Sequence, residues 1–183
     1  GTRGFGLIHE ALNTTELPAR IFHPTHINRE GWLFEAAPEL VSRGCTVDLT
    51  AFPDDGETLL AAEAIMRWHS DGHPMDKLTC SSDGAGCLPT FDADGRLEKM
   101  DIGRPETLLQ TIQSLRAEGM SWEDFLPVFT SNVANLLSLS GKGSLLQGAD
   151  ADLAVLTESG DLVHVFARGE IMVQDGQVRK YGV

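Results

Sequence analysis

Apolar and polar positions alternate with two different periods over the first third of the chain. Apolar residues recur every three or four positions over 5–12 and 32–41, which predicts amphipathic helices there, and Gly44 ends the second one. Between them, 20–26 reads as a short buried strand that runs into a turn. Strict alternation over 45–51 predicts a second strand.

The same succession of elements continues along the chain. A helix is expected over 57–69, a third strand over 77–82, and further helices over 105–118 and 121–139. A break of the last helix near Pro127 stays open. Pro105 suits the first turn of its helix, and the last helix opens with a serine three residues before an aspartate, as in a capping box. Strands that alternate with helices favour parallel pairing with right-handed crossovers. The pattern therefore predicts an α/β class, half of a barrel or sheet.

The pattern changes after Gly143. Short β-rich runs separated by turn residues follow, at 152–157, 162–167, 171–173 and 178–181. Asp175-Gly176 between two apolar runs is a strong hairpin signal. We place a domain boundary near 140–143, with a small β element after it.

Composition narrows the class of function. The 183 residues include 27 acidic and 14 basic side chains, a net charge of −13, and no basic cluster of the kind that binds nucleic acid. The apolar runs are shorter than the roughly 20 residues of a membrane span, and no signal peptide is visible at the N-terminus. Three cysteines without CxxC spacing indicate neither a disulfide framework nor a thiolate zinc site. We expect a soluble protein of a reducing, cytoplasmic compartment, without nucleic-acid or membrane partners.

Two candidate metal ligands follow predicted strands. His26 comes at the end of the first strand and Asp83 after the third, and the carboxyl ends of parallel strands gather at one edge. Imidazole and carboxylate suit zinc, and a carboxylate can also act as a base. A lone histidine after a strand is more often a packed, hydrogen-bonded residue, so that alternative stays open. His23, three residues earlier, would face the opposite side of an extended strand.

Arg29 is a candidate for binding a carboxylate, because a guanidinium offers a planar fork of donors. The alternative is a surface arginine that pairs with Glu30 or Glu35. Cys87 has no adjacent partner that would make it a nucleophile, and a small buried thiol is the commoner outcome. The glycine-rich loop 84–86 lacks the lysine and hydroxyl of a phosphate-binding loop.

Several longer motifs resemble a known family. The segments 132–139 (NVANLLSL), 141–145 (GKGSL) and 148–156 (GADADLAVL) resemble the C-terminal signature of the amidohydrolase superfamily. In that superfamily the signature marks the passage from the last barrel helix into a small β-sandwich. Within it, 24–29 (PTHINR) and 81–86 (SSDGAG) are similar to the isoaspartyl (β-aspartyl) dipeptidase family, and the similarity runs along the whole chain.

The resemblance implies a function and a set of roles. Such enzymes hydrolyse the β-aspartyl peptide bond of isoaspartyl dipeptides with a binuclear zinc centre in a metal-dependent hydrolase (β/α)8 TIM barrel. By resemblance, His26 and Asp83 are metal ligands and Arg29 binds a substrate carboxylate. Asp83 would also take the proton of the attacking hydroxide and pass it to the leaving amine. Residues 1–141 would be the C-terminal half of the barrel, with strands six to eight, and 142–183 strands of the β-sandwich.

The sequence departs from the family pattern at two points. The family also needs a His-x-His pair, a carbamylated lysine that bridges the two zinc ions and a further histidine, and none stands in a matching position. A whole barrel takes about 250 residues. We therefore expect a C-terminal portion that starts after the fifth strand and needs the missing N-terminal half for activity. Cys87 replaces a serine that contacts substrate, and since a thiol is a weaker donor, lower affinity or a different dipeptide follows.

Other functions stay open. A dihydroorotase-like or D-aminoacylase-like enzyme would keep the superfamily and change the substrate, although Arg29 as a carboxylate clamp favours dipeptides. From a different class, the chain is a catalytically inert fragment that acts as a folding or oligomerisation module. The partners expected from the resemblance are a small dipeptide, the missing N-terminal half and further copies in a homo-oligomer.

Overall fold

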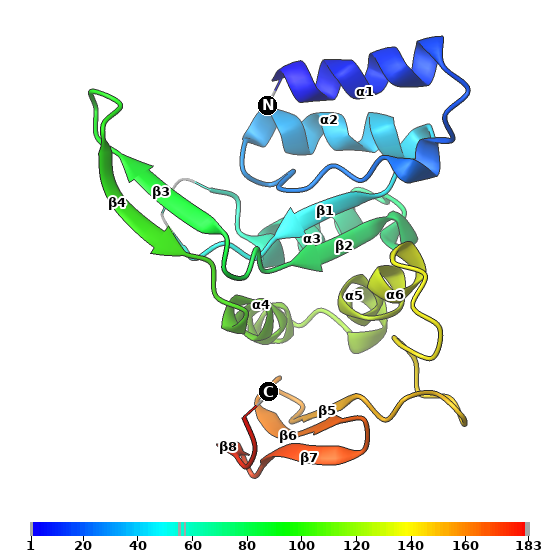
Figure 1. Ribbon diagram of the computed structural model, residues 1–183, viewed down its shortest axis with the longest axis vertical. Coiled ribbons are helices and arrows are strands. Elements are labelled where there is room, and N and C mark those ends of the chain that lie inside the picture. Colours follow the sequence, from blue (N-terminus) through cyan, green and yellow to red (C-terminus); the bar gives the residue numbers. More distant parts are fainter. Residues whose placement is uncertain (1, 55, 57, 182–183) are drawn as a thin grey trace.

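A pair of parallel strands forms the middle layer of the molecule (Figure 1). The computed structural model describes residues 2–54, 56 and 58–181. Strand β1 (Val47–Thr50) pairs with β2 (Leu78–Ser81), and helix α3 (Ala61–Ser70) connects them. The mixed α/β class and the parallel pairing expected from the strand and helix alternation are confirmed for this pair.

Helices lie on both sides of the pair. Helix α1 (Thr2–Thr14) packs on α2 (Gly31–Ser42), where the rings of Phe5 and Trp32 meet with centroids 6.0 Å apart. On the other side in Figure 1 lie α4, α5 and α6, and the last two contact β2. Their bounds are Glu106–Ala117, Trp122–Phe129 and Ser131–Leu136. Among the described residues, no helix combines the length and apolarity that crossing a membrane requires.

The expected strand over 20–26 is wrong. Residues Ala19–Ile21 form a single 3-10 turn, and the chain then runs beside β1 with only two backbone hydrogen bonds to it. Pro24 has no N–H to donate, and His26 has a left-handed backbone with φ of 60°. Because a regular ladder cannot form here, the parallel sheet has two strands, and the described part of the chain contains no closed barrel.

Several helix ends differ from expectation. Helix α3 begins at Ala61, while the expected start, Glu57, lies outside the described residues. Ser121 caps α5 by accepting a hydrogen bond from the Asp124 N–H at 3.3 Å, so the predicted cap is confirmed. The long helix expected from there breaks at Thr130, where φ and ψ are −130° and −91°.

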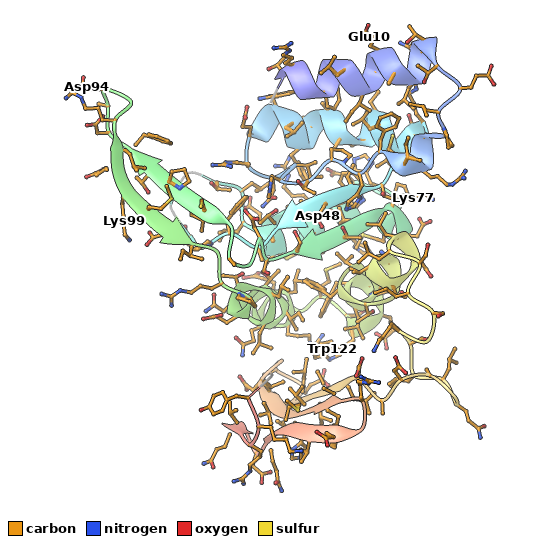
Figure 2. All side chains as sticks on the ribbon, in the orientation of Figure 1. Glu10, Asp48, Lys77, Asp94, Lys99 and Trp122 are labelled. Atoms are coloured by element: carbon orange, nitrogen blue, oxygen red, sulfur yellow. The ribbon has the colours of Figure 1, made fainter. Side chains whose placement is uncertain are left out.

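A hairpin projects from the body between β2 and α4 (Figure 1). Strand β3 (Cys87–Phe91) pairs antiparallel with β4 (Leu97–Ile102), and Asp94 lies at the distant tip (Figure 2). The sequence pattern predicted no helix or strand for this stretch, which is rich in Asp and Gly. The Asp94-Gly95 pair is nevertheless typical of a hairpin turn.

The C-terminal strands form one antiparallel sheet. It consists of β5 (Leu153–Leu156), β6 (Leu162–Ala167), β7 (Glu170–Gln174) and β8 (Gln177–Val178). Asp175 and Gly176 join the last two strands with φ of 52° and 72°, the positive angles that a two-residue hairpin turn requires. The expected hairpin is confirmed, while the domain boundary near 140–143 stays a prediction.

The hydrophobic core lies on one face of the parallel pair. Every residue of β1 is buried, and its apolar side chains Val47 and Leu49 join Leu78 of β2 in the core. Helices contribute the largest fully buried side chains, Trp68 and Phe125. The opposite face of the two strands is polar, and this asymmetry positions the candidate site.

Candidate functional site

A buried carboxylate lies at the centre of the polar face of the strands (Figure 2). Asp48 of β1 is 3% exposed, and each of its oxygens accepts a hydroxyl hydrogen bond at 2.6 Å, from Thr79 and from Ser81 of β2. Burial raises the pKa of Asp48, and the two hydroxyl donors oppose that rise. The pair of strands is thereby joined by side chains as well as by its backbone ladder.

Both histidines of the 20–26 segment contact this polar face. His23 Nδ1 lies 2.8 Å from Thr46 Oγ1 and its Nε2 3.3 Å from Thr79 Oγ1, while His26 Nδ1 lies 2.7 Å from Thr50 Oγ1. Because Thr46 and Thr50 point to the same side of β1, the expectation that the two histidines face opposite sides is wrong. It failed because the segment is not a strand. Burial lowers the pKa of His23, which favours its neutral form.

Asn28 fixes the segment to the end of β1. Its amide donates to the carbonyl oxygens of Thr50 and Leu59 at 2.9 and 2.8 Å, and its side-chain oxygen accepts the Thr50 N–H at 2.8 Å. The side chain is fully buried. No role was predicted for Asn28 from the sequence. Its side chain replaces hydrogen bonds that a strand ladder would supply, and this holds the neighbouring His26 at the strand end.

Asp83 lies in a tightly packed loop directly after β2. Its φ is 48°, and its carbonyl oxygen accepts the Gly86 N–H at 2.8 Å. A Cβ on Gly86 would overlap the Asp83 carboxylate, and one on Gly103 would overlap the Asp83 carbonyl oxygen. The loop can therefore close only around glycines at these two positions.

His26 and Asp83 lie at the same edge of the parallel pair. Thr50, which holds His26, is the register partner of Ser81, and Asp83 follows Ser81 by two residues. His26 and Asp83 both have positive φ, a strained backbone state that is common where a side chain is held for function. No group of three or more His, Cys, Asp or Glu among the described residues could enclose a metal ion. The metal-ligand roles themselves stay predictions.

The chemistry of the two side chains nevertheless fits zinc. Thr50 occupies Nδ1 of His26, and Nε2 has no hydrogen-bond partner within the described chain. A hydrogen bond to one ring nitrogen is how proteins orient a ligating imidazole and free the other nitrogen for the metal. The Asp83 carboxylate likewise has no donor among the side chains that the structure describes. Each side chain therefore has an atom that would be available to a zinc ion.

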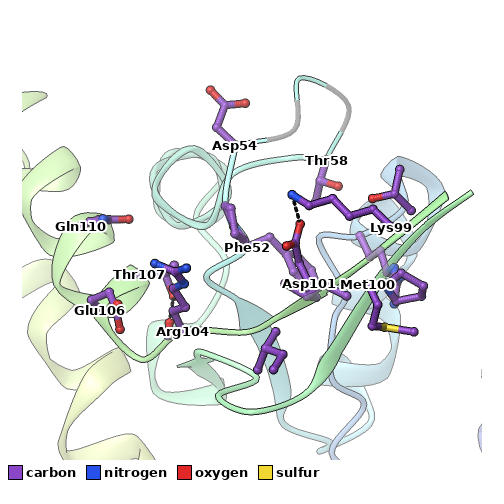
Figure 3. Close-up of a pocket in the computed structure, with 16 residues that line it drawn as sticks. Phe52, Asp54, Thr58, Lys99, Met100, Asp101, Arg104, Glu106, Thr107 and Gln110 are labelled. Atoms are coloured by element: carbon purple, nitrogen blue, oxygen red, sulfur yellow. Dashed lines mark hydrogen bonds and ion pairs between the residues drawn. The ribbon is translucent and has the colours of Figure 1, made fainter.

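A cavity of about 960 Å³ opens beside this edge (Figure 3). Its walls are the loop after β1, the hairpin and the start of α4. Phe52 connects the cavity to the edge, since its ring lies 5.8 Å from the His26 ring and 5.9 Å from the Arg29 guanidinium carbon. Pockets of this size accommodate small-molecule ligands. The lining residues with charged or aromatic side chains are Arg29, Phe52, Asp54, Lys99, Asp101, Arg104 and Glu106.

Arg29 is an exposed member of that lining. It does not pair with the acidic neighbours considered above, because Glu35 pairs with Arg67 at 2.6 Å and Glu30 accepts from the indole of Trp32. Within the described residues Arg29 forms no ion pair. In the part of the chain that the structure describes, Arg29 therefore pairs with neither Glu30 nor Glu35, and it lies in the cavity lining.

Cys87 differs from expectation. It is exposed at the start of β3, opposite Ile102, rather than buried. The cavity lining begins at the next residue, Leu88. The proposed contact of Cys87 with substrate stays a prediction.

Comparison with known proteins identifies structures that are similar to this chain. No protein-family model matches the chain. A crystal structure of β-aspartyl dipeptidase from Fervidobacterium islandicum, in complex with the dipeptide β-Asp-Leu, matches all of it with 34% identity and a TM-score of 0.88. The chain resembles β-aspartyl dipeptidase along its whole length. The match covers 47% of that relative, so the chain spans about half of its length.

A second structure supports the β-aspartyl dipeptidase resemblance, and a more distant one shares the fold alone. A second structure of the enzyme from the same organism matches the whole chain at 30% identity with a TM-score of 0.81 and 46% of its own length covered. A D-hydantoinase shares the fold over 93% of this chain and 49% of its own, with 18% identity and a TM-score of 0.57. The neighbours are hydrolases, as the motifs of the sequence predicted.

Proposed function

We propose that this chain supplies part of the active site of a zinc-dependent β-aspartyl dipeptidase, which hydrolyses the β-aspartyl bond of isoaspartyl dipeptides. The observation that carries the proposal is the placement of His26 and Asp83 at one edge of two parallel strands, beside a cavity that contains Arg29. The resemblance to β-aspartyl dipeptidase identifies the chemistry for which this arrangement is suited.

In this proposal the chain corresponds to a C-terminal portion. Residues 1–141 are the second half of a (β/α)8 barrel, and 142–183 provide strands of a β-sandwich. The other metal ligands, among them the bridging carbamylated lysine, come from a segment equivalent to the part of the relative that this chain does not match. The coverage of 47% supports that division.

The residues of this chain have separate tasks. His26 Nε2 and the Asp83 carboxylate would hold zinc, which supplies Lewis-acid polarisation of the scissile carbonyl. Arg29 binds a carboxylate of the dipeptide through its guanidinium fork. Asp83 accepts a proton from the attacking water and delivers it to the leaving nitrogen. The carbonyl carbon gains the water oxygen, the C–N bond breaks, and the products are aspartate and a free amino acid.

The test is the Asp83→Asn variant of the complete native protein that contains this chain. We expect kcat/KM for β-Asp-Leu to fall about 1,000-fold, because the proton-transfer group is lost. Asp94→Asn is the matched control, since that carboxylate lies at the exposed hairpin tip and should leave turnover unchanged. Unchanged turnover in Asp83→Asn would contradict the proposal.

Metal content tests the division of ligands independently. The complete protein should hold about two zinc ions per molecule, and the chain described here fewer. If this chain alone held two, the ligands assigned to the missing part would have to lie within it. That result would contradict the proposal that this chain is a C-terminal portion lacking some of the ligands. It would not bear on the hydrolase activity, which the kinetic test examines.

A further inference from the structure

A second arginine, Arg104, lines the cavity. Arg104 follows Gly103, whose α-carbon packs against the Asp83 carbonyl oxygen and whose own carbonyl accepts the Ala85 N–H at 3.0 Å. Arg104 and Pro105 then lead into α4. The backbone of Arg104 is anchored as well, because its carbonyl oxygen accepts the Thr107 hydroxyl at 2.7 Å. The position of Arg104 is thus tied to the Asp83 loop.

Arg104 is an exposed residue of the cavity lining. Of the three cations that line the cavity, Lys99 pairs with Asp101 at 2.6 Å, whereas Arg29 and Arg104 form no ion pair with a described residue. In Figure 3 the carboxylate of Asp54 points away from Arg104. The lining also contains three acidic residues, Asp54, Asp101 and Glu106, of which Asp101 pairs with Lys99. The two guanidinium groups, neither of them paired with a described residue, favour a ligand with carboxylates at two separated positions.

The chemistry decides which part of the substrate lies near Arg104. In the proposed function Asp83 hands the proton to the leaving nitrogen, so the leaving amino acid would lie near Asp83. Arg104 is connected to the Asp83 loop through Gly103, whereas Arg29 belongs to the His26 segment and contacts Phe52. The side chain of the leaving amino acid therefore extends toward Arg104, in a cavity of about 960 Å³ that has room for it.

We propose, on the basis of the proposed function, that Arg104 is a specificity-determining residue that selects isoaspartyl dipeptides whose second amino acid carries an acidic side chain. The guanidinium pairs with that side-chain carboxylate. A dipeptide with a neutral second residue leaves Arg104 unpaired, and one with a basic second residue brings two like charges together.

The experiment compares three dipeptides, β-Asp-Glu, β-Asp-Leu and β-Asp-Lys, with the complete native protein. We expect kcat/KM to be highest for β-Asp-Glu. In Arg104→Gln the ratio of kcat/KM for β-Asp-Glu over β-Asp-Leu should fall about tenfold, as for loss of a charged hydrogen bond. Arg104→Lys should retain part of the ratio, and Arg104→Glu should make β-Asp-Lys a better substrate than β-Asp-Glu.

A control and the opposite outcomes complete the test. Arg96→Gln removes an arginine at the exposed end of the hairpin, 80% exposed, and should leave the ratio unchanged. Equal losses for all three dipeptides in Arg104→Gln would overturn the inference, because Arg104 would then bind a group that all three share. A wild-type protein without preference for β-Asp-Glu would also overturn it. A wild-type protein that hydrolyses none of the dipeptides would instead remove the proposed function itself.

Discussion

The parallel pair with its helices and the C-terminal sheet differ in how they bury their side chains. Among the described residues, the buried hydrophobic side chains all lie between Ile27 and Ala134. In the C-terminal sheet and its turns, 153–178, the only buried residue is Gly160, and Val155 and Val178 are 41% and 52% exposed. A sheet normally buries one face against a second layer. Within the described chain, the C-terminal sheet has no such layer.

Several polar contacts join the two regions. The guanidinium of Arg116 on α4 donates to the Glu158 carbonyl oxygen at 3.1 Å and pairs with the Glu158 carboxylate. Gln113 donates to Asp161 at 3.2 Å, and its backbone packs against Gly160. The parallel pair and its helices are therefore stabilised by their own hydrophobic core. The C-terminal sheet contacts α4 through hydrogen bonds and an ion pair.

The largest effect is expected from truncation inside the core. Trp68→Ala should lower the free energy of unfolding by about 3–5 kcal/mol, because a fully buried indole leaves a large cavity. Phe166→Ala in the half-exposed sheet should cost about 1–2 kcal/mol. Urea unfolding followed by fluorescence and circular dichroism measures both. Equal losses of unfolding free energy in the two variants would contradict the difference between the regions.

The next effect concerns the packing around Asp83. Gly103→Ala should cost about 2 kcal/mol of stability, since the added methyl overlaps the Asp83 carbonyl oxygen and the backbone must shift. It should also lower the turnover of β-Asp-Leu by the complete protein. Gly31→Ala is the control, because nothing lies within 4 Å of the new methyl there, and it should change stability by less than about 0.5 kcal/mol.

Asp48 makes the stability of the parallel pair and its helices depend on pH. Because burial raises its pKa above the ordinary value of 3.8, the protonated carboxyl is the form that favours the fold. This contribution is complete below pH 3.8 and is lost as the pH rises through the raised pKa. Wild type should therefore lose stability relative to Asp48→Asn over that window, measured by urea unfolding at several pH values. A difference that is constant with pH would show that the burial penalty is absent.

The smallest effect on stability should come from the link between the regions. Arg116→Met keeps the apolar stem but removes the contacts with Glu158, the hydrogen bond to the Met120 carbonyl oxygen and the contact with the Trp122 ring. The free energy of unfolding should fall by about 1–2 kcal/mol. Proteolysis should nevertheless cut 153–178 faster, since the sheet loses its directed contacts. Arg96→Met serves as the control. Unchanged cleavage rates would mean that other contacts place the sheet.

Local patterns predicted those features that depend on nearby residues. The helices over 5–12 and 32–41, the capping serine at 121 and the hairpin turn at 175–176 were all found from periodicity and turn chemistry. The shared edge of His26 and Asp83 was also predictable, because parallel strands bring their carboxyl ends together whatever their sequence separation.

Features that depend on residues far apart in the sequence were not predicted. The apolar run over 20–26 looked like a strand, yet a ladder also needs an N–H at Pro24 and a β backbone at His26. Arg104 carries no motif and acquires its place beside the cavity only because Gly103 packs on the Asp83 loop.

The sequence by itself determined the α/β class, the order of most elements and the residue types able to bind zinc and a carboxylate. These follow from periodicity, capping and chemical type, which are properties of short segments. Tertiary structure alone decided that Asn28 anchors the His26 segment, that Asp48 is buried between hydroxyl donors, and that two arginines face one cavity. The reason is that burial and charge pairing are set by residues far apart in the chain, which only the folded backbone brings together.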